Sequence, residues 1–304
     1  MKGRVMKSTG SWYAVAGDDQ KHYSCRTKGK LRLEGIKETN PVAVGDHVTF
    51  ELEGENGVIS EILPRKNHML RQSVKKTGHS HVLAANVDQV VLLATLKEPR
   101  TSRGFVDRFL VSAESFRIPQ VLIFNKTDLL LPEEVEEQEA LLLLYNRLGV
   151  HTVGISALHN DLLFLDTILK DKVTLMAGHS GVGKSTLLNR LSPEITQTVG
   201  KISEFSSKGI HTTTFAEMFQ LSENTLIIDT PGVKEWGLVD MDQQEISDYF
   251  PEMRDRRLNC KFGSRCLHVN EPKCAIIEAV QKDQIARSRY ESYLSMVMGE
   301  DNRK

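Results

Sequence analysis

Residues 178–185 read "GHSGVGKS", which matches the pattern G-x-x-x-x-G-K-[ST] in full. The apolar segment "KVTLMA" at 172–177 leads into this stretch, and "STLLNRL" at 185–191 continues it with helical spacing. Glycines in such a loop let backbone N–H groups wrap around phosphate oxygens, and the following helix adds its N-terminal dipole. The stretch therefore predicts an α/β fold with a strand, a phosphate-binding loop and a helix.

Two segments are expected to surround the phosphates of a bound nucleotide. In the first, Lys184 should reach the β- and γ-phosphates, and Ser185 should bind Mg²⁺. The second, "DTPG" at 229–232, ends another apolar strand, where Asp229 would hold the Mg²⁺ shell through water and the Gly232 N–H would sense the γ-phosphate. The predicted contacts in these segments are Gly178, His179, Ser180, Gly181, Val182, Gly183, Lys184, Ser185, Thr186, Asp229 and Gly232.

The base of the nucleotide is expected to contact "NKTD" at 125–128. Asp128 can accept hydrogen bonds from the N1–H and N2 amine of guanine, whereas adenine would leave this carboxylate unpaired. The Lys126 stem would lie against the ring and Asn125 would tie the loop together, while "SAL" at 156–158 would present a backbone N–H to guanine O6. The predicted base-binding residues are Asn125, Lys126, Thr127, Asp128, Ser156 and Ala157.

The order of these motifs differs from that of ordinary GTPases, in which the phosphate loop comes first. Here the base loop at 125–128 precedes the phosphate loop at 178–185, and "DTPG" follows at 229–232. Rotating an ordinary GTPase chain gives this order. Because loops at the carboxyl ends of parallel strands meet at one crevice, the site can survive such a permutation.

The segment "SSKGIHTTTFAE" at 206–217 lies between the phosphate loop and "DTPG", so we expect it to be a switch loop. Val233 stands where many GTPases place a water-orienting Gln, which predicts slow intrinsic hydrolysis. His211 is a candidate for positioning water, with a solvent-facing histidine as the alternative. Thr213 is favoured among three consecutive threonines to complete the Mg²⁺ shell. The predicted catalytic residues are thus His211, Lys184 and Thr213.

Three of the four cysteines cluster near the C-terminus in the pattern Cys260-x5-Cys266-x-His268-x5-Cys274. Three thiolates and one imidazole complete a tetrahedral Zn²⁺ shell, so we expect one structural zinc ion. Buried free thiols or a redox pair are the alternatives. Cys25 lies far from this group in the sequence and is expected in a core.

The rest of the chain predicts a multidomain α/β protein. Residues 1–64 contain five short strand-like segments, which suit a small closed barrel such as an OB-fold. Residues 65–81 are polar and basic without a clear period, so they are expected to form a linker or a nucleic-acid-facing loop. Beyond them, apolar strands alternate with helices, as in a mostly parallel sheet. The expected domains are 1–68, an RNA-binding OB-fold; 69–240, a permuted GTPase; and 241–304, a helical zinc-binding domain.

The net charge of −1 is unevenly distributed: about +5 over residues 1–81, −10 over 82–252 and +4 over 253–304. Basic flanks around an acidic centre favour contact of both ends with a polyanion, although charge varying by chance between domains would look the same. No segment approaches the roughly 20 apolar residues of a membrane helix, and the N-terminus lacks an apolar signal core. We therefore expect a cytoplasmic protein without a membrane partner.

Taken together, these motifs resemble the RsgA (YjeQ) family, the ribosome small subunit-dependent, circularly permuted GTPases. The markers cover nearly the whole chain: "NKTD", "GHSGVGKSTLLN", "KGIHTTT", "DTPGVKEWGL", "RYESYLSM" and the cysteine pattern. One departure is that five residues separate the first two cysteines where the family suggests four. The resemblance implies GTP hydrolysis to GDP and phosphate, stimulated by the small (30S) ribosomal subunit during its late assembly. It also implies 16S rRNA and other assembly factors as partners, Mg²⁺ with the nucleotide, and a monomer.

Three other functions are compatible with parts of the sequence. The chain could be a nucleotide-gated binding module whose hydrolysis is incidental, or a translation factor that acts on mature ribosomes. A P-loop kinase or small-molecule ATPase is the third alternative, and "NKTD" at 125–128 argues against it.

Overall fold

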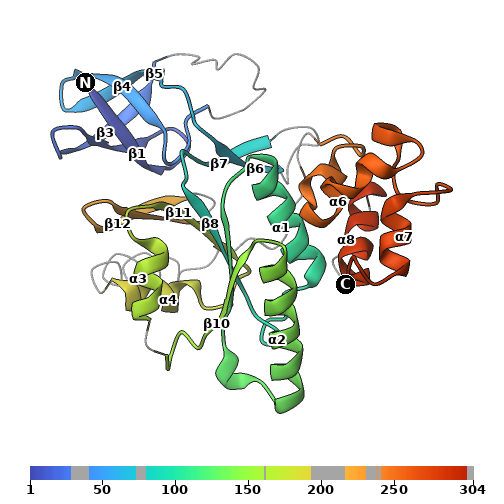
Figure 1. Ribbon diagram of the computed structural model, residues 1–304. Helices are drawn as coiled ribbons and strands as arrows, with labels where there is room; N and C mark the ends of the chain where they lie inside the picture. The colour runs from blue at the N-terminus through green and yellow to red at the C-terminus, as the bar shows by residue number, and fades with distance from the viewer. Residues whose placement is uncertain are drawn as a thin grey trace.

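The computed structural model describes residues 1–28, 41–72, 80–160, 162–192, 216–230, 238 and 241–299. Figure 1 shows three parts: an N-terminal barrel, a central sheet with helices on both faces, and a group of short C-terminal helices beside α1. The predicted His211, Thr213 and Gly232, and most of the expected switch loop at 206–217, lie outside the described residues.

The N-terminal barrel confirms the expected five-stranded fold. Its sheet runs β1-β2-β3-β5-β4 and closes through a further pairing between β1 and β4. β3 and β5 are parallel, whereas the other neighbours are antiparallel. Alternate residues point inward, and Val5, Val15, Cys25, Phe50 and Ile59 are fully buried. The strands are β1 Lys2–Ser8, β2 Tyr13–Gly17, β3 His22–Thr27, β4 His47–Glu53 and β5 Asn56–Ile62.

The segment after the barrel differs from the expected linker or loop. Strand β6 (His68–Gln72) pairs antiparallel with β7 (Ser80–Ala85), so this part of the chain forms a two-stranded ribbon. Met69 lies opposite Ala84, and both are fully buried in the core beneath α1. The expectation of a linker or loop was wrong for these residues. Few of their side chains are apolar and buried, so the sequence shows no alternation of apolar and polar residues that would indicate a strand.

The central sheet contains five parallel strands in the order β10-β9-β8-β11-β13. β12 adds antiparallel to β13 and also pairs with β1 through the Lys7–Glu217 register. Among the described residues the barrel and the central strands thereby form one eleven-stranded sheet. The central strands are β8 Gln89–Ala94, β9 Gln120–Phe124, β10 His151–Gly154, β11 Val173–Gly178, β12 Glu217–Ser222 and β13 Thr225–Asp229.

Helices cover the two faces of this sheet (Figure 1): α1 and α2 on one, α3 and α4 on the other. Strand β8 shows why, because its buried residues alternate between the two cores, with Val90 and Leu92 toward α1 and α2 and Val91 and Leu93 toward α3 and α4. Burying each such side chain contributes about 1.5–3 kcal/mol. The helices are α1 Arg103–Ser115, α2 Pro132–Arg147, α3 Leu163–Leu169 and α4 Lys184–Leu191.

The C-terminal part is helical, as expected, but its helices are short and joined by 3₁₀ turns. They are α6 Pro251–Arg254, α7 Ala275–Gln281 and α8 Arg287–Val297. Their core contains Phe250, Met253, Ile276 and Tyr293 together with the clustered cysteines. No helix in the described ranges has the length and apolar composition needed to cross a membrane.

Candidate nucleotide site and metal centre

The predicted nucleotide-binding loops meet at one edge of the sheet. "NKTD" follows β9, "SAL" follows β10, the phosphate loop follows β11 and Asp229 ends β13. The Asn125 carboxamide joins three of these loops directly. Its Nδ2 donates to the Val182 carbonyl at 2.8 Å, and its Oδ1 accepts from the Ala157 N–H at 2.8 Å. Loops that are distant and permuted in the sequence are therefore held in one constellation.

The phosphate loop requires glycine at two positions for reasons of space. Gly183 has φ +100°, and a Cβ there would lie 2.3 Å from Asn125 Nδ2. At Gly178, with φ +154°, a Cβ would lie 2.4 Å from the Leu93 carbonyl oxygen. Any side chain at Gly183 would displace the residue that connects the base loop to the phosphate loop. The helix α4 begins directly after it, at Lys184.

Lys184 and Asp229 form the charged floor of the phosphate end. Lys184 is 8% exposed and donates from Nζ to the Gly178 carbonyl at 2.9 Å, so its side chain folds back over the loop. Burial lowers the pKa of Lys184, and the nearby Asp229 opposes that shift. Burial also raises the pKa of Asp229 to about 6, although Lys184 lowers it. Asp229 Oδ1 is buried without a hydrogen-bond partner among the described residues, which suits a water bound to Mg²⁺.

The base end is more open. Lys126 adopts a left-handed conformation with φ +64° and donates from Nζ to the Glu98 carbonyl in the loop after β8. The Asp128 side chain is 26% exposed, and its Oδ2 lies 3.9 Å from His159 Nε2, so the "NKTD" and "SAL" loops lie side by side. Ser156 is buried beneath them.

Other predicted residues differ in their exposure. Val182 and Ala157 are buried, His179, Thr127 and Thr186 are half-buried, and Ser180, Gly181 and Ser185 are exposed at the mouth of the site. The His179 ring lies against Phe105 of α1, with 4.0 Å between ring centroids. The phosphate loop is therefore in contact with the first turns of α1.

Sequence inspection missed two residues that shape the "SAL" loop. Asn160 Oδ1 accepts the Ser156 N–H, and the Asn160 N–H donates to the Ser156 carbonyl at 2.9 Å. From α4, Arg190 Nη1 donates to the Ala157 carbonyl at 2.8 Å. An Asn four residues after the serine is a weak turn signal in the sequence. Nothing in the sequence marks Arg190, because its partner comes from a loop on another strand.

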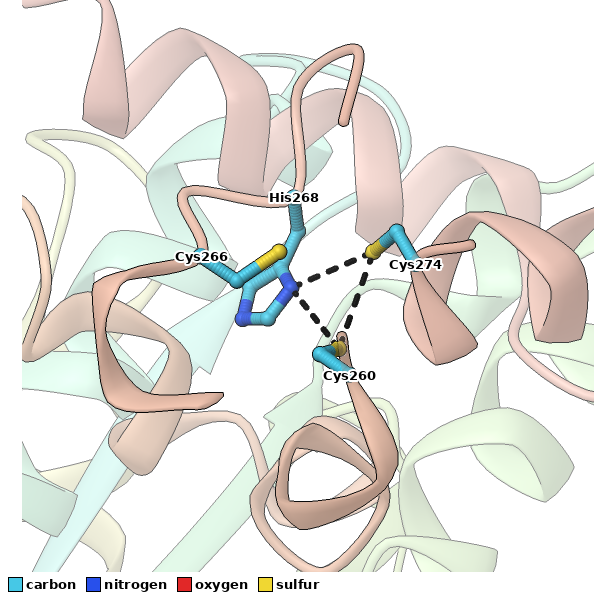
Figure 2. Close-up of side chains that lie close together, drawn as sticks. All are labelled: Cys260, Cys266, His268 and Cys274. Carbon is cyan, nitrogen blue, oxygen red and sulfur yellow. Dashed lines mark hydrogen bonds between the residues drawn. The ribbon is translucent and has the colours of Figure 1, made fainter. Parts of the chain in front are cut away.

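The four predicted metal ligands converge in one buried cluster. Figure 2 shows the side chains of Cys260, Cys266, His268 and Cys274 pointing toward a common centre. One ligand atom from each residue lies within 4.8 Å of the others. Cys260 and Cys274 Sγ are 3.8 Å apart, and His268 Nδ1 lies 3.5 Å and 3.3 Å from them. Zn–S bonds of 2.3 Å in a tetrahedron place two sulfurs about 3.8 Å apart, so the spacing fits such an ion.

The surroundings of the cluster hold its loop in place and disfavour a charged thiolate at Cys274. Glu271 accepts the N–H groups of Leu267, Val269 and Asn270 at 2.7–3.0 Å. Burial raises the pKa of Cys274 to about 12, so a cation is required to obtain a thiolate there at neutral pH. The donor set therefore fits one metal ion.

The C-terminal part docks on α1 through a buried ionic network. Arg289 of α8 donates to Asp107 of α1 and from Nε to Glu252 Oε1 at 2.7 Å. Tyr145 of α2 donates to the same Asp107 at 2.8 Å, and the Arg289 guanidinium lies 4.5 Å from the Phe250 ring centroid. Burial opposes the charge of Arg289, but Asp107 and Glu252 raise its pKa above its usual range.

Comparison with known proteins agrees with this architecture. The family model described as "RsgA GTPase" matches residues 62–239, and the "RsgA N-terminal domain" model matches residues 2–59. This chain belongs to the RsgA GTPase family.

RsgA relatives match from end to end. A protein of Christiangramia forsetii named "Small ribosomal subunit biogenesis GTPase RsgA" is 50% identical over 99% of this chain and 97% of its own length. One of the same name from Phocaeicola vulgatus is 46% identical over 100% and 98%. The crystal structure of YjeQ from Thermotoga maritima superposes with a TM-score of 0.75 at 33% identity, covering 100% of this chain and 99% of that one.

A second solved structure, YloQ, is described as a circularly permuted GTPase and superposes with a TM-score of 0.71 at 29% identity, covering 100% and 96% of the two chains. The permuted motif order predicted from the sequence is thus confirmed. As an RsgA GTPase, this chain is a GTP hydrolase.

Proposed function

We propose that this RsgA GTPase acts in the biogenesis of the small ribosomal subunit, hydrolysing GTP when that subunit stimulates it and then leaving. The observation that carries the proposal is the end-to-end likeness to relatives named for this role, which includes both flanking parts as well as the nucleotide site. A nucleotide site alone would not distinguish this function from that of other GTPases.

The proposed nucleotide contacts follow from the loops at the sheet edge. Asp128 takes the N1–H and N2 amine of guanine, and Lys126 packs along the ring. The phosphate loop from Gly178 to Gly183 wraps the phosphates with its N–H groups, and Lys184 binds the β- and γ-phosphates. Asn125 keeps the base and phosphate ends in register, which its two 2.8 Å hydrogen bonds support.

Two metal ions complete the proposal. Mg²⁺ accompanies the nucleotide, held by Ser185 and, through water, by Asp229, with Thr213 as a further ligand. Zn²⁺ is the proposed ion of the Cys3His cluster, because its sulfur spacing and ligand types suit tetrahedral zinc. His211 remains the proposed water-positioning residue.

The proposed partner surface includes 16S rRNA. Lys261, Arg265 and Lys273 are exposed around the metal centre, and Lys261 lies 5.4 Å from the centroid of the exposed Phe262 ring. Cations beside an accessible aromatic ring suit phosphate contact combined with base stacking. We further propose that the protein acts as a cytoplasmic monomer and works beside other assembly factors.

The decisive experiment measures GTP hydrolysis with and without purified 30S subunits at matched salt concentration. Stimulation of at least about 10-fold is expected, because the residue after "DTPG" is Val233 and an external group must complete the water-positioning geometry. The same assay with 50S subunits serves as the control. Equal rates under all three conditions would contradict the proposal, and ATP that displaces bound GDP would contradict the guanine assignment.

A further inference from the structure

The backbone N–H groups of the "SAL" loop are almost all engaged within the protein. The Ser156 N–H donates to Asn160 Oδ1, and the Ala157 N–H donates to Asn125 Oδ1 at 2.8 Å. His159 and Asn160 both donate to the Ser156 carbonyl, at 3.2 Å and 2.9 Å. The Leu158 N–H is the remaining donor of this loop, and no residue in the described part of the chain accepts it.

This donor belongs to a peptide unit that a cation holds from its other side. Arg190 Nη1 donates at 2.8 Å to the Ala157 carbonyl, which shares its peptide plane with the Leu158 N–H. A trans peptide is rigid and its C=O and N–H point in opposite directions, so fixing the oxygen aims the hydrogen. A charged donor on the oxygen also polarises the unit and strengthens its N–H as a donor.

The loop that carries this peptide lies beside the carboxylate assigned to the base. His159, the next residue, has its Nε2 3.9 Å from Asp128 Oδ2, the carboxylate assigned to N1–H and N2 of guanine. O6 is adjacent to N1 on the same edge of guanine, and it is an acceptor that needs one donor. Leu158 is 65% exposed, so the residue adds little to the core.

We propose that Arg190 is a specificity-determining positioning residue that aims the Ala157–Leu158 peptide N–H at O6 of guanine. This assignment rests on the proposed guanine site. Within the "SAL" loop it assigns the O6 donor to Leu158, because the Ala157 N–H already donates to Asn125. It also connects base selection to the helix that starts at the phosphate loop, because Arg190 lies in the last turn of α4.

The test compares the affinities of the full-length protein for GDP, 6-thio-GDP and IDP in the Arg190→Met variant. Sulfur at C6 is a weak acceptor, so the ratio of GDP to 6-thio-GDP affinity measures the O6 contact. IDP lacks the N2 amine, so the ratio of GDP to IDP affinity measures the Asp128 contact. We expect Arg190→Met to lower GDP affinity about five- to ten-fold and 6-thio-GDP affinity much less, with the GDP to IDP ratio unchanged.

Three further variants test whether the change in affinity comes from the Arg190 hydrogen bond. Arg190→Lys should restore part of the GDP to 6-thio-GDP ratio, because an ammonium can still donate to the carbonyl. Leu158→Pro removes the N–H while keeping the arginine and should reproduce the Arg190→Met pattern. Arg147→Met, which removes an exposed arginine from the last turn of α2, should leave all three affinities unchanged.

The outcomes separate this inference from the function on which it rests. Equal losses of GDP, 6-thio-GDP and IDP affinity in Arg190→Met would reduce the residue to a structural role and overturn the proposal. Unchanged affinities would overturn it as well. Wild-type protein that binds ADP as tightly as GDP would overturn the guanine site itself, and the role of Arg190 with it.

Discussion

The nucleotide site draws its residues from loops spread between Asn125 and Asp229, whereas the metal centre takes all four ligands from the segment between Cys260 and Cys274. The first is open at its base end, with exposed side chains, and each loop is positioned by a different strand. The second is closed and buried, and its ligands lie on a segment that contains one 3₁₀ turn, Gly263–Arg265, and no strand. The nucleotide site therefore depends on the whole central fold, whereas the four candidate metal ligands are brought together by one short segment.

Removal of the metal should have the largest effect on stability, and it tests whether the C-terminal part depends on its metal centre while the nucleotide site does not. Cys274→Ser, or treatment with a strong chelator, should abolish stoichiometric metal binding and open residues 256–297 to hydrogen exchange. Structural zinc contributes on the order of 10 kcal/mol to small sites of this kind, more than these short helices can replace. GDP affinity should change less than about threefold. Metal analysis and hydrogen exchange provide the readout.

Cys25→Ala is the matched control, because it removes the one cysteine outside the cluster and should leave the metal content at one ion per chain. Loss of GDP binding together with the metal would show that the two sites are not independent.

Breaking the ionic contact between the two regions should have the next largest effect. Arg289→Met leaves Asp107 and Glu252 without their cation in a buried interface, at a cost of about 3–5 kcal/mol. Hydrogen exchange should increase along α8 and on the adjoining face of α1. Because the metal ligands are local, the metal content should stay at one ion per chain.

Arg287→Met provides the comparison, since the Arg287 side chain is 84% exposed and its pair with Glu291 should contribute under about 1 kcal/mol. If both variants destabilise the protein equally, the buried network does not hold the interface.

The substitution Lys184→Ala tests the nucleotide site without altering the metal centre. Loss of a buried cation at the phosphates should weaken GDP and GTP binding about 100-fold, or about 3 kcal/mol. Titration with a fluorescent guanine nucleotide measures the change. Lys170→Ala, at an exposed position, is the control. If Lys184→Ala keeps the wild-type nucleotide affinity, Lys184 does not bind the phosphates. If this variant changes the metal content, the nucleotide site and the metal centre are not independent.

The smallest effect is expected where the barrel meets the central sheet. Lys7 and Glu217 pair at 2.9 Å across β1 and β12, but both side chains are partly exposed. Lys7→Ala should therefore lower the free energy of unfolding by less than about 1 kcal/mol in a denaturant titration. A loss of about 3 kcal/mol or more would mean that this junction contributes as much as the buried network on α1.

Local patterns in the sequence predicted much of this protein. The phosphate loop, "NKTD" and the cysteine spacing each identify their chemistry within a few residues, and the strands of the barrel and the five parallel strands of the central sheet follow from apolar periodicity. Strand β12 was not predicted, and its first residue, Glu217, was expected at the end of the switch loop. The β6–β7 ribbon was not predicted, because Met69 and Ala84 are buried only through tertiary packing in the core beneath α1. The pairing of Arg190 with Ala157, and of Arg289 with Asp107, could not be predicted because each partner is chosen by tertiary packing, 33 and 182 residues away.

Helix α1 touches both regions, and this has a consequence for the order in which the protein is made. Its Phe105 meets the phosphate loop, its Asp107 meets Arg289, and its Val111 is fully buried in the core that the last helix closes. During synthesis the ribosome releases α1 long before α8. Until α8 emerges, the nucleotide-binding part keeps an apolar and acidic face of α1 uncovered, so its folding is completed by a segment that is made later.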